Sequence, residues 1–286
     1  MYDVILVGHG PAAVSAALYL RRANKTAALI GKDFGALEKA EKIENYFGLS
    51  APLSGIELAK TGLEQAKALG ADIIEDEIFD ISWMGDFTLT GKKQSYQTKS
   101  VVIACGSARK TLPIKGMAEH EGKGVSYCAV CDAFFYRGKT VGVLGAGEYA
   151  LHELEHLLNV VEKAYLFTNG APAPENLPDK TTAITEKIVE VCGETIVDSV
   201  LLQNGEKIDL SGLFVALGSA SAADFARKLG VPVENGVILV DEKMCTMVEG
   251  LFAAGDCIGG LKQVATAVAE GAQAAMSVIA FLNKGK

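Results

Sequence analysis

Short apolar runs followed by glycine-rich turns recur along the chain and predict the buried strands of a parallel sheet. The first run spans residues 3–7 and leads through a glycine turn into a predicted helix at 14–23, after which residues 26–30 form the next expected strand. The same order of strand, turn and helix returns at residues 140–161. This internal repeat predicts an α/β fold with two nucleotide-binding-type, Rossmann-like domains.

Between and after the two repeated units, further strand-like segments complete the expected sheets. Alternating apolar and polar residues at 79–103 predict a strand meander, and Asn204-Gly205 predicts a hairpin turn. Other strands are expected at residues 187–191, 196–202, 213–218 and 250–256. The longest apolar stretch, residues 264–282, contains Glu270, Gln273 and Ser277. We interpret it as a mostly buried helix rather than a membrane span.

Composition and charge narrow the class of protein. A chain of 286 residues is long enough for two domains, each with its own core. The net charge of −8 argues against a nucleic-acid-binding protein and against affinity for anionic membranes. Six cysteines in this length do not make a secreted disulfide scaffold, and the first strand begins too early for a signal peptide. We therefore expect a cytoplasmic protein.

The first glycine turn carries a dinucleotide-binding pattern. Gly8, Gly10 and Ala13 form G-x-G-x-x-A, with Pro11 and Ala12 between them. Glycines at these places let the backbone approach a pyrophosphate that rests on the helix N-terminus. A plain tight turn between strand and helix is the alternative interpretation.

An acid near the other end of the chain is placed to bind the same kind of ligand. Gly255 and Asp256 follow the expected strand at 250–256, and residues 259–263 precede the last helix. A carboxylate at a strand end suits the hydroxyls of a bound cofactor. A helix-capping role for Asp256 is the simpler alternative.

Two cysteines near the middle of the chain are the strongest chemical signal. Cys128 and Cys131 have the C-x-x-C spacing typical of redox pairs, and Asp132 directly after them can shuttle the proton that thiol–disulfide exchange requires. A structural zinc would need a second pair of ligands, and the other four cysteines are not spaced as one. Two ordinary buried cysteines remain a further alternative.

The helix after the second glycine turn contains an H-E-x-x-H sequence, the zinc-protease pattern. At about 100° per residue, His152 and His156 point away from the apolar stripe of this helix. They would lie on solvent without an obvious third ligand. We interpret them as part of a solvated helix face and expect no metal site.

The motifs together resemble the low-molecular-weight thioredoxin reductases, flavoproteins that hold FAD. The resemblance covers essentially the whole chain, and the stretch from Cys128 to Tyr136 is its most specific part. The other matching segments are the two glycine turns, residues 43–48 and 104–106, Gly255-Asp256 and Lys262-Gln263.

The resemblance implies an FAD-binding domain at residues 1–113 and 241–286, with a redox-disulfide domain inserted at 114–240. It places FAD contacts at Gly8, Gly10, Pro11, Ala12, Ala13, Asn45, Gly255, Asp256, Lys262, Gln263 and Val264. It further implies that Cys128 attacks thioredoxin, that Cys131 faces the flavin and that Asp132 donates the proton. A homodimer is expected on the same ground.

The second nucleotide site departs from the NADPH-dependent members of this family. Those members carry His-Arg-Arg after the second strand of the inserted domain, whereas residues 164–174 here contain no charge. A 2′-phosphate needs Arg or Lys, and a free ribose 2′-hydroxyl is usually bound by an acid. The glycine turn at 145–150 is retained, but such a turn also serves helix–strand packing. Glu148 within it adds a negative charge where a pyrophosphate would lie.

The sequence therefore most resembles the family variant that takes electrons from reduced ferredoxin. A ferredoxin with a reduction potential of about −400 mV lies ~130 mV below a thioredoxin at about −270 mV. Transfer of two electrons from the first to the second is therefore favourable by roughly 6 kcal/mol. Candidate docking cations are Arg21, Arg22, Lys25, Arg109 and Lys110. The alternatives are an NADPH- or NADH-dependent enzyme with unusual nucleotide contacts, an enzyme acting on another small disulfide protein, and a flavin-linked redox sensor.

Overall fold

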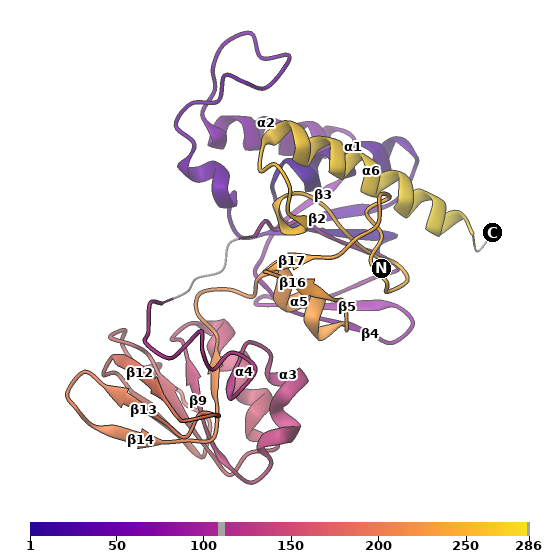
Figure 1. The fold of residues 1–286 in the computed structure, drawn as a ribbon. Coiled ribbons are helices and arrows are strands. Elements are labelled where there is room, and N and C mark those ends of the chain that lie inside the picture. The colour runs from indigo at the N-terminus through magenta and orange to yellow at the C-terminus, as the bar shows by residue number, and fades with distance from the viewer. Residues whose placement is uncertain (108–111, 285–286) are drawn as a thin grey trace. The chain divides into compact units, whose positions relative to one another are not determined.

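A computed structural model describes residues 1–107 and 112–284, which fold as two compact units (Figure 1). Unit 1 comprises Met1–Ala108 and Ser221–Lys286, and unit 2 comprises Arg109–Ala220. Each unit contains its own five-stranded parallel sheet, which confirms the predicted α/β fold with two Rossmann-like sheets. Two of the candidate docking cations, Arg109 and Lys110, lie outside the described residues.

The end of the inserted segment differs from the sequence-based domain boundary at residue 240. Residues 221–240 belong to unit 1, because helix α5 (Ala222–Lys228) packs against strand β4 (Ile78–Trp83). Lys228 Nζ lies 3.1 Å from Asp80 Oδ1, and the Lys228 side chain is only 2% exposed. A buried ammonium is stable only with such a partner, so this ion pair helps to hold α5 on unit 1.

Unit 1 is built on a parallel sheet with strand order β18-β7-β1-β2-β3. Its strands are β1 (Val4–Val7), β2 (Ala27–Gly31), β3 (Asp72–Glu75), β7 (Val101–Ile103) and β18 (Leu251–Ala253). The central strand β1 is buried along its whole length, as its unbroken apolar run predicted. Helices α1 (Pro11–Arg22), α2 (Gly55–Ala68) and α6 (Val264–Asn283) gather on one side of this sheet (Figure 1).

Helix α6 packs closely on α1 but is not mostly buried, so that prediction was wrong. A Cβ atom at Gly271 would lie 2.1 Å from the Ala12 carbonyl oxygen, so only glycine permits this approach. By length and composition α6 is apolar enough to cross a membrane, yet only 28% of its apolar window is buried. The buried positions are Ala267, Gly271, Ala274, Ala275 and Val278, which form one stripe facing the core. The apolar residues outside that stripe concealed this one-sided packing in the sequence.

The remaining elements of unit 1 are short. The predicted meander is confirmed as an antiparallel sheet of β4, β5 and β6, and β16 pairs with β17 in a hairpin. Two 3₁₀ turns complete the unit. The bounds are β5 (Phe87–Gly91), β6 (Ser95–Thr98), β16 (Val233–Glu234), β17 (Val237–Ile238), η1 (Gly35–Lys39) and η3 (Asp256–Ile258).

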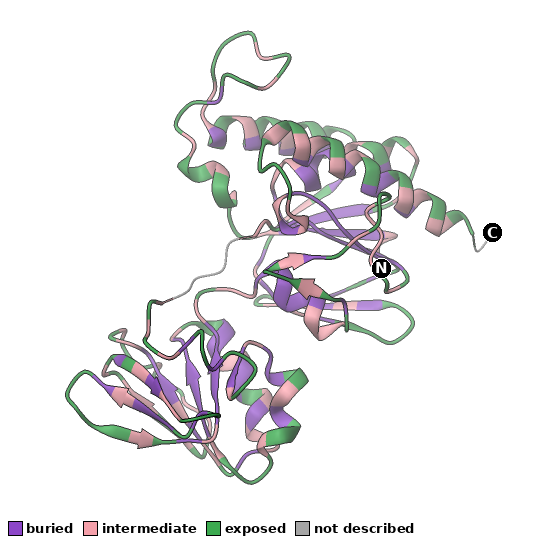
Figure 2. Cartoon of the chain, in the orientation of Figure 1, coloured by how far each residue is buried: buried purple, intermediate pink, exposed green. Residues whose placement is uncertain are grey.

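Unit 2 repeats the parallel sheet with strand order β11-β10-β9-β15-β8. Its strands are β8 (Val125–Ser126), β9 (Thr140–Leu144), β10 (Lys163–Phe167), β11 (Thr181–Ile184) and β15 (Leu213–Val215). An antiparallel sheet follows, formed by β12 (Ile188–Cys192), β13 (Ser199–Leu202) and β14 (Lys207–Asp209). The predicted turn at Asn204-Gly205 joins β13 to β14, with Gly205 at φ 88°. Buried residues concentrate in the strands of each unit (Figure 2).

The helices of unit 2 carry its chemistry. Helix α4 (Glu148–Leu158) follows β9, as the internal repeat predicted. The short helix α3 (Ala129–Asp132) and the 3₁₀ turn η2 (Ala133–Tyr136) contain the C-x-x-C segment and its aromatic neighbours. Because α3 packs against α4, residues on α4 can reach the cysteine turn.

Candidate functional site

The first glycine turn joins β1 to α1 and presents the start of that helix. Gly10 is the N-cap residue, Pro11 stands at the first helical position, and the first turn holds no acidic residue. An added Cβ at Gly8 would lie 2.5 Å from the Ala104 carbonyl oxygen, and Gly8 has φ 123°, so packing against the end of β7 requires glycine there. An added Cβ at Gly10 would meet nothing closer than 3.9 Å. The space at Gly10 and the exposed helix start fit a pyrophosphate.

The end of β18 reaches the same turn. Gly255 has φ 84°, and an added Cβ there would lie 3.1 Å from the Ala12 side chain. The Gly255 backbone N–H donates to Glu270 Oε2 at 2.8 Å, which fixes the strand end against α6. Burial raises the pKa of the Glu270 carboxyl. Asp256 follows Gly255 as the first residue of η3.

The other residues expected to contact the cofactor also meet within unit 1. Asn45 Nδ2 donates to Gln263 Oε1 at 3.0 Å, although the two residues are 218 positions apart. Lys262 Nζ donates to Ser107 Oγ at 2.8 Å, just beyond the end of β7. Val264 is the first residue of α6. The fold thus brings together segments that the sequence placed at the two ends of the chain.

His9, between the two glycines, is an internal group of this turn. Its side chain is buried, and Nε2 lies 3.4 Å from the Leu29 carbonyl oxygen. Burial lowers the pKa of this imidazole below 6.5, against smaller opposing effects of backbone carbonyls and of Asp33 and Glu75. His9 is therefore neutral near pH 7.

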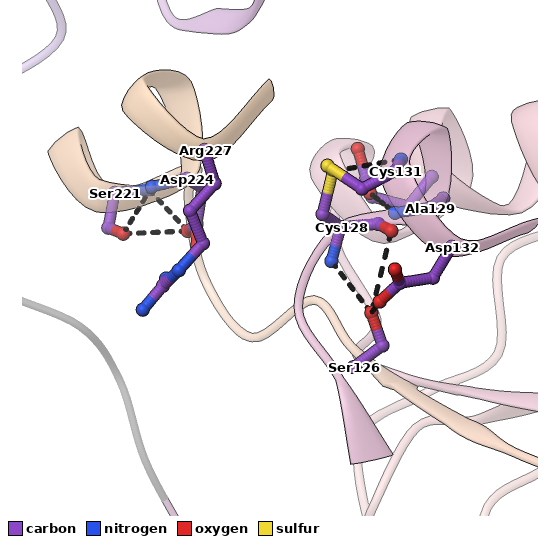
Figure 3. A network of polar contacts seen from close by, with 9 residues as sticks. Ser126, Cys128, Ala129, Cys131, Asp132, Ser221, Asp224 and Arg227 are labelled. Carbon is purple, nitrogen blue, oxygen red and sulfur yellow. Dashed lines mark hydrogen bonds and ion pairs between the residues drawn. A yellow bond between two sulfur atoms is a disulfide. The ribbon is translucent and has the colours of Figure 1, made fainter. Parts of the chain in front are cut away.

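In unit 2, Cys128 and Cys131 form a disulfide at the start of α3 (Figure 3). The Cys131 backbone N–H donates to Cys128 Sγ at 3.1 Å. Such a donor favours negative charge on the sulfur once the disulfide is reduced. Cys128 is 3% exposed, whereas Cys131 is exposed, so the two sulfurs differ in accessibility.

Asp132 is linked to the first cysteine through a serine that the sequence analysis missed. Ser126 Oγ donates to Asp132 Oδ2 at 2.6 Å and accepts the Cys128 backbone N–H at 3.1 Å (Figure 3). The serine therefore fixes the carboxylate next to the disulfide turn. A hydroxyl residue two positions before a helix-starting cysteine was the available signal.

Glu153 is the second acid at this turn, and it too was missed. Its side chain is 2% exposed, and Oε2 accepts the Ala129 backbone N–H at 2.9 Å. In the sequence Glu153 stood out only as the glutamate of the H-E-x-x-H pattern. At about 100° per residue it lies about 60° from Ala150 and 40° from Leu157, inside the buried stripe of α4.

The two histidines of that pattern are not on an open solvent face, which corrects the prediction. Both are only half-exposed, and their rings stack edge to face with Nε2 atoms 3.2 Å apart. Within residues 1–107 and 112–284, no group of three or more His, Cys, Asp or Glu side chains converges in a way that could hold a metal ion.

The second glycine turn has the packing of the first but different surroundings. An added Cβ at Gly145 would lie 2.2 Å from the Ala216 carbonyl oxygen, so packing requires this glycine. Gly147 is the N-cap of α4 with free space around it, and the exposed Glu148 occupies the first turn. A negative side chain at this helix start opposes an anionic ligand.

The polar side chains after β10 are used by the protein itself. Thr168 Oγ donates to the Ala171 carbonyl oxygen, and Asn169 Oδ1 accepts the Ile188 backbone N–H at 3.0 Å. These bonds close the turn where a bound pyridine nucleotide would place its adenosine ribose. One cation lies nearby, since an added Cβ at Gly170 would be 3.1 Å from Lys187 Cε.

Comparisons with known proteins identify the family of the chain. The sequence profile of a family described as pyridine nucleotide-disulphide oxidoreductase matches residues 2–271. The thioredoxin reductase of Aquifex aeolicus is 35% identical, covering 100% of this chain and 95% of the relative. That of Helicobacter pylori is 37% identical, covering 99% of both chains.

Two solved structures show the same fold over nearly the whole chain. The atypical thioredoxin reductase TRi from Desulfovibrio vulgaris Hildenborough superposes with a TM-score of 0.92 at 33% identity, covering 99% of each chain. A ferredoxin-flavin thioredoxin reductase from Clostridium acetobutylicum superposes with a TM-score of 0.72 at 30% identity, covering 99% of this chain and 98% of the other.

Proposed function

We propose that this chain, which belongs to the thioredoxin reductases of the pyridine nucleotide-disulphide oxidoreductase family, reduces thioredoxin with electrons from reduced ferredoxin. The family makes it a flavoprotein disulfide oxidoreductase with FAD as its cofactor. Bound FAD supplies a group that accepts electrons one at a time and releases them in pairs. The proposal adds the donor and the residue roles.

Unit 1 would hold the FAD. The start of α1 at Gly10 and Pro11 would bind the pyrophosphate, while Gly8, Ala12 and Ala13 shape the turn. Asp256 at the end of β18 would bind hydroxyl groups of the cofactor. The remaining contacts would come from Asn45, Gly255, Lys262, Gln263 and Val264.

Unit 2 would pass the electrons to thioredoxin through its disulfide. Once the bond between Cys128 and Cys131 is reduced by two electrons, the Cys128 thiolate attacks a sulfur of the thioredoxin disulfide. Cys131 then displaces the reduced thioredoxin and restores the disulfide, and Asp132 gives a proton to the leaving thiolate. Because Cys128 is buried, docking of thioredoxin must first uncover its sulfur.

Exposed apolar side chains beside the disulfide support a protein substrate. Phe134 and Phe135 on η2 are 69% and 70% exposed, and Val130 on α3 is 51% exposed. Large apolar groups that surround a reactive pair in this way favour contact with another protein surface. They lie within a few residues of Cys131, so a partner bound there is close to the sulfurs.

The observation that carries the donor assignment is the turn after β10. A pyridine nucleotide is usually held there by arginines or by an acid. In this turn the side chains of Thr168 and Asn169 are instead hydrogen-bonded to the backbone of the protein. Loss of one charge-assisted contact to a phosphate costs about 2–3 kcal/mol, or roughly a hundredfold in affinity. The likeness to a ferredoxin-flavin thioredoxin reductase supports the same donor.

A second candidate donor, NADPH, is favoured by one observation. The stem of Lys187 packs at Gly170, so its ammonium group lies in reach of the region where a 2′-phosphate would bind. A single exposed lysine is a weak substitute for paired arginines, because it binds phosphate as a point charge without bidentate geometry. We therefore rank NADPH second.

Anaerobic thioredoxin turnover with each donor tests the proposal. Reduced ferredoxin should support turnover, and NADPH or NADH should not do so at comparable rates. If NADPH does support turnover, and Lys187→Ala raises the KM for NADPH with little change in kcat, the second candidate is correct. A homodimer in the cytoplasm, as the resemblance implies, is part of the proposed function. Sedimentation of the holoenzyme tests the dimer.

A further inference from the structure

We infer that Glu153 is a positioning residue for the redox disulfide, and that its buried charge keeps the reduced cysteine pair strongly reducing. Glu153 acts through the backbone of Ala129, the residue that directly follows Cys128. The inference rests on the thioredoxin reductase chemistry and is independent of the electron donor.

The contact is specific and shielded. Glu153 belongs to the buried side of α4, where it stands among Ala150, Leu154 and Leu157. A carboxylate is rarely buried without partners, and here one oxygen takes the Ala129 N–H at 2.9 Å. A core position is thus occupied by an acid that reaches the first residue of the cysteine helix. A hydrophobic residue would fill this position without the desolvation cost of a carboxylate, so a role at the disulfide explains the acid better than packing does.

A negative charge on Glu153 would counteract the Cys131 backbone N–H, which favours a thiolate at Cys128. Helix starts and backbone N–H donors stabilise a cysteine thiolate, and the Cys131 N–H already points at Cys128 Sγ. Glu153 occupies the neighbouring donor, Ala129 N–H, and brings negative charge to the same end of α3. Asp132 adds a second carboxylate on this turn through Ser126. Both carboxylates therefore disfavour a thiolate at Cys128.

A less stable thiolate makes the pair a better reductant. Reduction of the disulfide breaks the Sγ–Sγ bond, consumes two electrons from the flavin and takes up to two protons from solvent. When one thiol is ionised at working pH, the reduced form is stabilised and the couple becomes more oxidising. By limiting that ionisation, Glu153 keeps electron transfer from Cys128 and Cys131 to thioredoxin favourable.

The test is the reduction potential of the disulfide in the variant Glu153→Gln. Glutamine has nearly the same shape and keeps an acceptor for the Ala129 N–H, so it removes the charge while preserving the contact. The holoenzyme is equilibrated at pH 8 in thiol–disulfide buffers, and alkylation of the peptide containing Cys128 and Cys131 is read by mass spectrometry. We expect the equilibrium to shift about tenfold toward the dithiol, which corresponds to a potential about 30 mV higher.

Glu155→Gln is the matched control, because Glu155 is an exposed acid on the same helix. It removes the same charge from α4 and should leave the potential unchanged. A potential for Glu153→Gln that equals the wild-type value, or that moves downward, overturns the inference. So does an equal shift in Glu155→Gln, since the effect would then be one of overall charge.

Glu153→Ala separates the contact from the charge. It also removes the acceptor of the Ala129 N–H, so the Ala129 amide hydrogen should exchange faster in Glu153→Ala than in Glu153→Gln. Both variants should raise the reduction potential of the disulfide. Equal exchange at Ala129 in the alanine variant and the wild type would overturn the positioning role. If the alanine variant does not fold, the glutamine variant and its control still decide the inference.

Discussion

At the residue scale, the two glycine turns separate glycines needed for packing from glycines free for a ligand. Gly8 and Gly145 each face a carbonyl oxygen that an added Cβ would strike, whereas Gly10 and Gly147 have room. Gly10 and Gly147 have ordinary negative φ values of −81° and −97°. A side chain at Gly10 or Gly147 can therefore interfere with a bound nucleotide without straining the protein.

Gly10→Val should consequently fold normally and lose FAD. The valine side chain would occupy the space of the pyrophosphate, so we expect at least a hundredfold weaker retention, ~2.8 kcal/mol. The measurement is the ratio of flavin to protein after gel filtration, alongside the thermal unfolding of the flavin-free protein. Gly147→Val is the matched variant in the second turn. It should retain FAD and full activity with ferredoxin, and a loss of activity supported by NADPH in this variant would indicate that a nucleotide does bind at α4.

His9 gives a pH prediction at the same scale. Its pKa is lowered by burial in the folded protein, while the unfolded chain has a histidine near 6.5. Below pH 6.5 the unfolded state therefore binds more protons, so stability falls as the pH drops through the window between 6.5 and the lowered folded pKa. His9→Gln keeps a donor toward the Leu29 carbonyl oxygen and should flatten this dependence. Urea midpoints between pH 5 and pH 8 measure it, and identical slopes for the two proteins would contradict the assignment.

Residue-level prediction from the sequence succeeded where a motif fixes the neighbours. Cys128, Cys131 and the first glycine turn were found because their spacing alone implies the local geometry. Ser126 was missed because its bonds depend on how the chain turns between β8 and α3, and Glu153 was missed because its contact depends on how α3 packs on α4. Such a contact appears in the sequence only as a polar residue within an apolar stripe.

At the scale of elements, the disulfide turn is held from both sides by separate parts of unit 2. Ser126 at the end of β8 binds the Cys128 N–H, and Glu153 on α4 binds the Ala129 N–H. The positions of both sulfurs are therefore set before a substrate arrives. This preorganisation suits a reaction that repeatedly opens and closes the same bond.

Replacement of either cysteine should stop turnover and leave the flavin site intact. Cys128→Ser and Cys131→Ser each remove one sulfur of the exchanging pair, so thioredoxin reduction should be lost. In the proposed assignment FAD binds to unit 1, so flavin content and its reduction by the donor should match those of the wild type. Insulin-coupled thioredoxin assays and anaerobic absorbance spectra measure the two properties. Substantial thioredoxin reduction by either variant would rule out the disulfide route.

Most elements were predictable because apolar runs and glycine turns determine them locally. The parallel strands β1 and β9 and the meander of β4, β5 and β6 fall where their patterns indicated. The exceptions involve tertiary partners. Helix α6 looks buried on all sides in sequence, but its apolar residues extend beyond the stripe that packs on α1 and β18. Helix α5 joins unit 1 through an ion pair with β4 that no local pattern reveals.

At the scale of the whole molecule, one unit offers a dinucleotide site and the other a disulfide. Under the proposed function the donor would deliver electrons to FAD bound at unit 1, and the second glycine turn in unit 2 would not be required for that step. Three of the candidate docking cations lie at the far end of α1 from the glycine turn, about 18 Å along the helix. They are Arg21, Arg22 and Lys25. Arg21 and Lys25 are also bonded to the Leu69 carbonyl oxygen and to Asn283. This placement does not favour them as a ferredoxin contact near the turn.

The most direct measurement is anaerobic stopped-flow reduction of the bound flavin by each donor in turn. The account predicts that reduced ferredoxin bleaches the flavin absorbance within catalytic times. NADPH and NADH at millimolar concentration should leave it largely oxidised, because the turn after β10 gives them no paired arginines. Lys187→Ala should change neither result. Rapid, saturable bleaching by NADPH that Lys187→Ala weakens would contradict the ferredoxin assignment and make the protein a pyridine-nucleotide-dependent thioredoxin reductase.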